Sequence, residues 1–171
     1  VLLEGMILNR FWTEMEGAGC DSISEDYIAY RELDYDDCEI MLNGSMNYFP
    51  GNEDTLLEEN VNVMQLIAAS CAGQALDFII AEPATLHEFD MGEYFIDLRL
   101  VLTEEQLQAY DEYLIYSEIR TDIPIMLDIT GCEKVEGVYA YQHDQLAFGV
   151  IQNAPHMEEL TSFADYLMEG K

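Results

Sequence analysis

The chain has 171 residues, 50% of them hydrophobic, which is enough to bury the core of one domain. Its 35 acidic residues against 6 basic ones give a formal net charge of -29, which repels nucleic-acid phosphates and anionic membrane surfaces. The composition therefore excludes nucleic acid as an expected partner, and an aromatic content of 11% argues against a disordered chain.

The first 36 residues are predicted to form an N-terminal helical segment. Apolar residues recur there at helical spacing, at Leu3, Met6, Ile7, Phe11 and Met15. Ser22 and Glu25 then have the spacing of a capping box and predict the start of a second, short helix.

The sheet core is predicted to occupy residues 37–171. A largely alternating strand is expected within residues 38–49, and Thr55 with Glu58 predicts the capped start of a helix that ends near Gly73. The short apolar run from Ala75 to Ala81 follows at once, as expected of a strand covered by helices on both faces. This strand, helix and strand predict a right-handed parallel crossover.

The remaining elements extend the sheet. Residues 83–89 predict a short helix, and Thr103 with Gln106 predicts a capping box at the start of another. A strand is expected at 122–129, a hairpin at 138–141 and 146–151, and a closing helix from Met157 to Met168. We therefore expect one α/β domain over residues 1–171, with a mixed, largely parallel sheet in three layers.

The C-terminal two-thirds of the chain resembles one lobe of the extracellular solute-binding proteins of bacterial ABC transporters. The similar pieces are Ala72-Gly73-Gln74, Leu76 to Ile80, and Gly92-Glu-Tyr-Phe-Ile-Asp-Leu98. Residues 123–130, 149–153 and 158–168 also look like uncharacterised, membrane-anchored extracytoplasmic proteins of Firmicutes.

This resemblance implies a periplasmic-binding-protein-like fold and a ligand held where strand ends meet a cleft. In that family two lobes enclose the ligand, whereas the present chain has the length of one lobe. The resemblance also implies an extracytoplasmic location, and because the chain starts at Val1 we expect an upstream segment that anchors it to the membrane.

Polar residues at the ends of predicted strands are the candidate ligand-binding residues. They are Asn43, Ser45, Glu82, Thr85, Asp128, Thr130 and Asn153. The same residue types are also favoured by ordinary turns and helix caps, so their pattern does not by itself define a site.

No motif predicts catalysis, a metal or a cofactor. The carboxylates of Asp77, Glu82, Asp97 and Asp128 could pair as in a glycosidase, but nothing in their spacing sets the required separation. The histidines His87, His143 and His156 lack the spacing that places two imidazoles on one helix face, and the four cysteines include no C-x-x-C pair.

The leading hypothesis is a non-catalytic extracytoplasmic domain that binds or senses a small solute. A second hypothesis is a protein-interaction or oligomerisation module that uses an exposed apolar face at Leu3, Ile7 and Phe11 together with the tyrosines. A carboxylate-dependent hydrolase is the third. The expected partners are accordingly a small solute or another protein.

Overall fold

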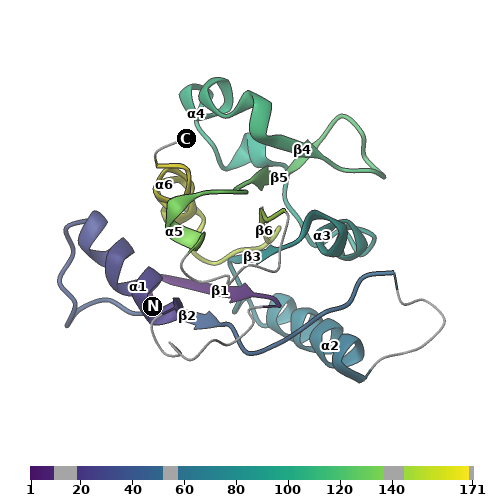
Figure 1. Ribbon diagram of the computed structural model, residues 1–171, viewed down its shortest axis with the longest axis horizontal. Coiled ribbons are helices and arrows are strands. Elements are labelled where there is room, and N and C mark those ends of the chain that lie inside the picture. Colours follow the sequence, from purple (N-terminus) through teal and green to yellow (C-terminus); the bar gives the residue numbers. More distant parts are fainter. Residues whose placement is uncertain (10–18, 52–57, 137–144, 170–171) are drawn as a thin grey trace.

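The computed structural model describes residues 1–9, 19–51, 58–136 and 145–169, which build an α/β fold around one six-stranded sheet (Figure 1). The strands are β1 (Leu3–Ile7), β2 (Ile40–Asn43), β3 (Phe78–Ala81), β4 (Leu114–Tyr116), β5 (Pro124–Asp128) and β6 (Ala147–Val150). The α-helices are α1 (Gly19–Tyr30), α2 (Glu58–Ala72), α3 (Pro83–Asp90), α4 (Glu104–Ala109), α5 (Glu133–Glu136) and α6 (Met157–Met168). Two 3₁₀ turns, η1 (Leu98–Leu100) and η2 (Asp111–Tyr113), flank α4.

The strand order β2-β1-β3-β6-β5-β4 makes the sheet mixed. Strand β1 pairs in parallel with both β2 and β3, whereas β6 is antiparallel to its neighbours β3 and β5. Strand β5 therefore runs in the same direction as the first three strands, and β4 closes the sheet antiparallel to it. The expected three-layer α/β class with a mixed sheet is confirmed.

The helices cover both faces of this sheet. The chain passes from β1 outward to β2 and then back across β1 to β3, so right-handed crossovers put α1 and α2 on opposite faces. Figure 1 shows α1, α5 and α6 on one side, and α2 and α3 on the other. Strand β3, third in the order, is buried at all four positions, as expected for a strand with helices above and below.

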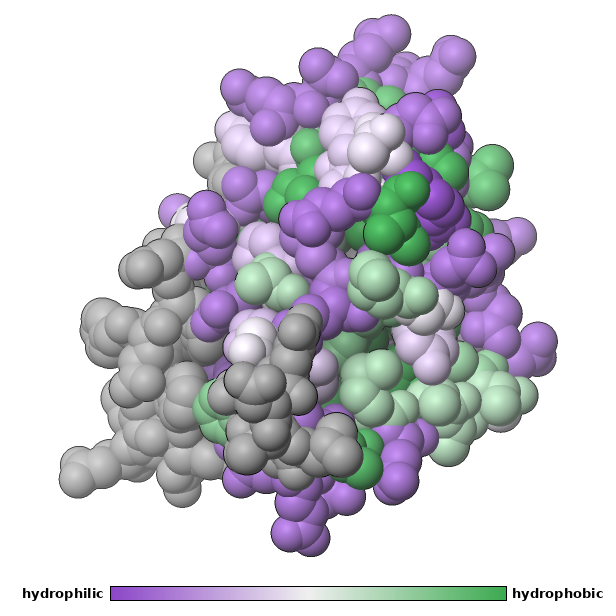
Figure 2. All heavy atoms as spheres, turned by 90° about the vertical axis from the view of Figure 1, so that its right-hand side faces the viewer, coloured by the Kyte–Doolittle hydropathy of each residue, from purple (hydrophilic) through white to green (hydrophobic). Residues whose placement is uncertain are grey.

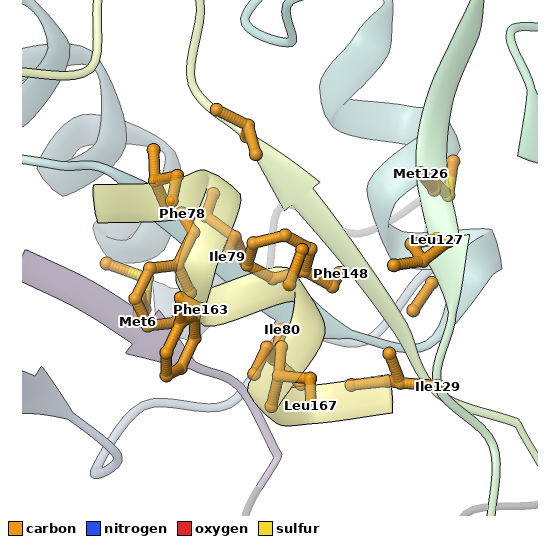
Figure 3. Packing of buried hydrophobic residues seen from close by; sticks show 14 of the residues in the cluster. Met6, Phe78, Ile79, Ile80, Met126, Leu127, Ile129, Phe148, Phe163 and Leu167 are labelled. Carbon is orange, nitrogen blue, oxygen red and sulfur yellow. The ribbon is translucent and has the colours of Figure 1, made fainter. Parts of the chain in front are cut away.

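An aromatic cluster joins α6 to the sheet (Figure 3). The fully buried ring of Phe163 lies 4.8 Å from that of Phe78 in β3 and 5.9 Å from that of Phe148 in β6. On its other side it meets Tyr27 of α1 edge-on at 5.0 Å. One side chain of α6 thus contacts both the sheet and the neighbouring helix.

Two glycines let aromatic rings lie directly on the strands. A Cβ atom on Gly5 of β1 would come within 2.2 Å of Cζ of Phe78, and one on Gly149 of β6 within 2.8 Å of the Phe95 ring. Both contacts are too short for a side chain, so these two positions require glycine as long as the rings keep their places.

The prediction of a helix at the N-terminus is wrong for the described residues there, which form a strand. Leu3, Met6 and Ile7 belong to β1 and are buried. A strand covered on both faces is apolar at nearly every position, so residues three and four apart are also apolar, and spacing alone does not distinguish it from a helix. The N-terminal segment is therefore part of the sheet core, while Phe11 and Met15 lie outside the described residues.

The predicted helix starts and the predicted hairpin differ in how well they agree with the structure. The capping box of Thr103 and Gln106 is present, with both reciprocal hydrogen bonds formed. Helix α1 begins at Gly19, so its predicted start at Ser22 is wrong. The predicted helix start at Thr55 and the first arm of the hairpin, residues 138–141, lie outside the described residues; β6 pairs with β3 and β5.

We expect the aromatic cluster to contribute strongly to the free energy of unfolding. Phe163→Ala should lower the free energy of unfolding by about 3–5 kcal/mol, because it removes a buried ring and leaves a cavity between α6 and the sheet. Urea denaturation measures the loss. The control Leu100→Ala removes a side chain that is 73% exposed and should change stability by no more than about 0.5 kcal/mol. Similar losses in the two variants would contradict this packing.

Candidate functional site

The carboxyl ends of the parallel strands meet at one edge of the sheet, here called the carboxyl edge. Asn43 ends β2, Glu82 directly follows β3, and Asp128 ends β5. Because β1 lies between β2 and β3 and its two crossovers cover opposite faces, this edge contains the topological switch point of the sheet. Open α/β sheets bind their ligands at such a point.

Six of the seven residues predicted to bind a ligand lie at this edge, in turns and a helix start. Asn43 Oδ1 accepts hydrogen bonds from the Ser45 backbone N–H and hydroxyl, at 3.2 and 3.0 Å. Asp128 Oδ1 accepts one from the Thr130 N–H at 2.9 Å, and Thr130 Oγ1 accepts one from the Leu146 N–H at 3.0 Å. These contacts hold the polar groups beside the strand ends.

Glu82 and Thr85 complete this group at the start of α3. Glu82 is the N-cap residue, and its side chain makes no capping hydrogen bond. Thr85 in the first turn is only 2% exposed. The seventh residue, Asn153, follows β6 at the opposite edge, where its side-chain N–H donates to the Cys71 carbonyl at 2.7 Å. Six of the candidates therefore lie along the same edge of the sheet, spread from β2 to β5, and Asn153 lies at the opposite edge.

The opposite edge carries a carboxylate that is completely buried. Asp77, just before β3, has 0% exposure, and its Oδ2 accepts a hydrogen bond from the Glu4 N–H at 2.7 Å. Its Oδ1 accepts another from the His156 N–H at 2.8 Å. A buried carboxylate is stable only when its oxygens are hydrogen-bonded, and here the donors come from β1 and from the start of α6.

Glu4, Asp77 and His156 form a compact group of side chains, here called the amino-edge cluster. His156 Nδ1 lies 2.8 Å from Asp77 Oδ2, and its side chain is 30% exposed. The ligand atoms of the three residues all lie within 4.8 Å of one another. Glu4 also borders a hollow of about 370 Å³ between β2 and α2, whose lining includes Met41, Leu66 and Leu76.

The sequence did not indicate this cluster. Its members are 73 and 79 residues apart, and only the pairing of β1 with β3 and the position of α6 bring them together. The one local signal was His156 near the start of a predicted helix, which is equally typical of a cap.

The four carboxylates considered for a hydrolase do not converge. Asp77 lies at the opposite edge of the sheet. Glu82 directly follows β3 and Asp128 ends β5, and because β6 lies between these two strands the two residues are roughly 10 Å apart along the sheet. Asp97 Oδ2 forms an ion pair with Arg99 Nη2 at 2.7 Å, and this ion pair holds the pKa of Asp97 below its ordinary value. Their positions do not favour the glycosidase arrangement.

A second carboxylate near the start of α6 joins this helix to α1. Glu159 accepts hydrogen bonds from Arg31 Nε at 2.7 Å, from Arg31 Nη2 at 3.1 Å and from the Tyr27 hydroxyl at 2.6 Å. Burial alone would raise the pKa of Glu159, but these hydrogen bonds outweigh it and hold the pKa below its ordinary value. Burial and the bond to Glu159 raise the pKa of Tyr27.

Comparison of the chain with protein-family models, with curated proteins and with solved structures finds no match.

The Glu159 contacts make stability depend on pH. A carboxyl group whose pKa is lower in the folded state contributes stability that is fully present above its ordinary pKa of about 4.5. This contribution is lost as the pH falls through the lower, folded-state value. At pH 7, Glu159→Gln should therefore reduce the free energy of unfolding by about 1–2 kcal/mol, since Arg31 stays partly exposed and screened.

Urea denaturation from pH 7 down to pH 3 checks this expectation. The difference between wild type and Glu159→Gln should narrow at the acidic end. The neighbouring exposed Glu158→Gln is the matched control and should show little difference at any pH. A gap that stays constant with pH would show that the charge of Glu159 is not responsible.

Proposed function

We propose that the chain is a non-catalytic domain that binds or senses a small solute at its carboxyl edge, in the manner of one lobe of a solute-binding protein. The observation that carries this proposal is the switch point between β1 and β3, at the edge where six polar candidates lie. A site at strand ends can present side chains from several elements to one ligand.

The charge of the chain favours a cationic solute. Glu82 and Asp128 are carboxylates at this edge, and the chain as a whole has a formal net charge of -29. Such a field raises the local concentration of cations and repels anions. A single lobe supplies only one wall of a cleft, so we expect weak binding, with a Kd of roughly 0.1 to 1 mM.

The experiment uses spermidine as the probe, titrated into the chain at low ionic strength and followed by calorimetry. The double variant Glu82→Gln with Asp128→Asn should weaken binding about tenfold, since each carboxylate contributes a charged contact. The control removes two exposed charges away from this edge, with Glu93→Gln and Glu104→Gln.

Because both double variants change the net charge equally, the long-range attraction falls by a similar amount in each. The control should therefore weaken binding no more than about twofold. Equal losses in the two variants, or no heat of binding at millimolar spermidine, would overturn the proposed site.

We further propose display outside the cytoplasm on a membrane-anchored chain, as the expected resemblance to exported proteins implies. Among the residues that the structure describes, no helix has the length and apolar character needed to cross a bilayer. Protease treatment of intact cells that make the native protein tests the location: loss of the domain is expected, and its survival until lysis would overturn this part.

The alternative of a protein-interaction module loses one of its supports. Leu3 and Ile7, expected on an exposed helix face, are fully buried in β1. What remains is a set of exposed apolar side chains that includes Met91, Tyr116 and Ile119. Figure 2 shows hydrophobic residues interspersed with hydrophilic ones on the face that it displays. We therefore favour the solute-binding proposal.

A further inference from the structure

We infer that the amino-edge cluster of Glu4, Asp77 and His156 is a binding site for a divalent transition-metal ion of the zinc type. The site lies at the opposite edge of the sheet from the proposed solute site and does not depend on it. The inference rests on the positions of the donor atoms, on their chemistry, and on the shortage of other positive charge around Asp77.

The donor atoms are almost as close as a bound ion requires. They lie within 4.8 Å of one another, and ligand bonds of about 2.0–2.1 Å in a tetrahedral zinc site place donors roughly 3.4 Å apart. His156 Nδ1 and Asp77 Oδ2 are already 2.8 Å apart, so an ion between them needs only a small separation of the pair. The Glu4 side chain is half-buried on β1, and its carboxylate oxygen lies within the same 4.8 Å.

One imidazole and two carboxylates form a donor set that suits zinc or cobalt better than calcium or magnesium. The last two ions prefer oxygen ligands alone, and calcium takes six to eight of them. Three protein ligands leave a fourth position of a tetrahedral ion open to water. The site is therefore expected to discriminate between imidazole-binding metals and hard cations.

The central ligand is held in place before any ion arrives. Each oxygen of Asp77 accepts a backbone N–H, one from Glu4 and one from His156, and these bonds fix the plane of the carboxylate. Hydrogen bonds of this kind orient metal ligands and strengthen binding. Because the Asp77 N–H also donates to the Glu4 carbonyl at 2.7 Å, the two residues are fixed relative to each other.

The buried charge of Asp77 lacks a permanent positive partner among the described residues. Its one ion-pair contact there is His156, which is charged only when protonated. The four basic side chains in the described ranges already pair with other carboxylates: Arg31 with Glu159, Arg99 with Asp97, Arg120 with Asp90 and Lys134 with Asp26. Buried carboxylates are normally paired or bound to a metal, so a divalent ion would supply the missing charge.

The start of α6 does not prevent cation binding here. A helix N-terminus carries the equivalent of about half a positive charge, which opposes a cation. The carboxylates of Glu4 and Asp77 offer two full negative charges at the same place, so their attraction for a cation is larger than its repulsion by the helix N-terminus. Binding would connect β1, the residue before β3 and the start of α6, and should therefore raise the unfolding temperature.

The test is calorimetric titration of the whole chain, stripped of metal with chelator and then reduced, with zinc chloride. One ion per chain and a Kd in the micromolar range or tighter are expected, with little heat from magnesium chloride. His156→Ala should weaken zinc binding at least thirtyfold and Glu4→Gln about tenfold. The control His87→Ala removes an imidazole on α3, outside the cluster, and should change the Kd less than twofold.

Two further measurements separate loss of metal binding from loss of folding and identify the ligand atoms. Circular dichroism verifies that each variant is folded; Glu4→Gln keeps every backbone bond to Asp77 and serves if His156→Ala does not fold. The cobalt complex should show visible absorption without a thiolate charge-transfer band, since Cys38, Cys71 and Cys132 are not part of the site. A thiolate band, or unchanged zinc affinity in both cluster variants, would overturn the inference.

Discussion

The buried carboxylate of Asp77 is the interaction on which the arrangement of the sheet and its last helix most depends. It accepts hydrogen bonds from the backbone of β1 and from the start of α6, while its own carbonyl accepts the Ile151 N–H after β6. An ionised carboxylate in the interior costs several kcal/mol unless such bonds are made. Segments that are distant in the sequence are therefore held together at a single residue.

The large acidic excess acts on the rest of the molecule in a different way. Each basic residue of the described ranges forms an ion pair with a carboxylate. Arg31, for example, joins α1 to α6, whereas Arg99 pairs within a local turn. The remaining carboxylates stay mostly in solvent, where repulsion between them is screened by salt. Stability thus comes from the apolar core, and the charge mainly selects which ligands approach.

The sequence predicted those elements whose signals are local. Strand β3 is a short apolar run, α6 has apolar residues on one face, and the start of α4 has a capping box, so each could be recognised from neighbouring residues alone. Strand β1 could not, because a strand buried on both faces and an amphipathic helix share the spacing of Leu3, Met6 and Ile7. Glu4 and His156 could not be linked to Asp77 either, since their proximity follows from strand order rather than from spacing.

Gly5 and Gly149 have a consequence for how this protein can vary. Because each glycine lacks a side chain, it leaves room for an aromatic ring. The ring of Phe78 lies over Gly5 of β1, and the ring of Phe95 lies over Gly149 of β6. A larger residue at position 5 is therefore compatible with the fold only if position 78 becomes smaller at the same time. In a set of diverged homologues, positions 5 and 78 should therefore change as a pair, because a larger residue at position 5 needs a smaller one at position 78.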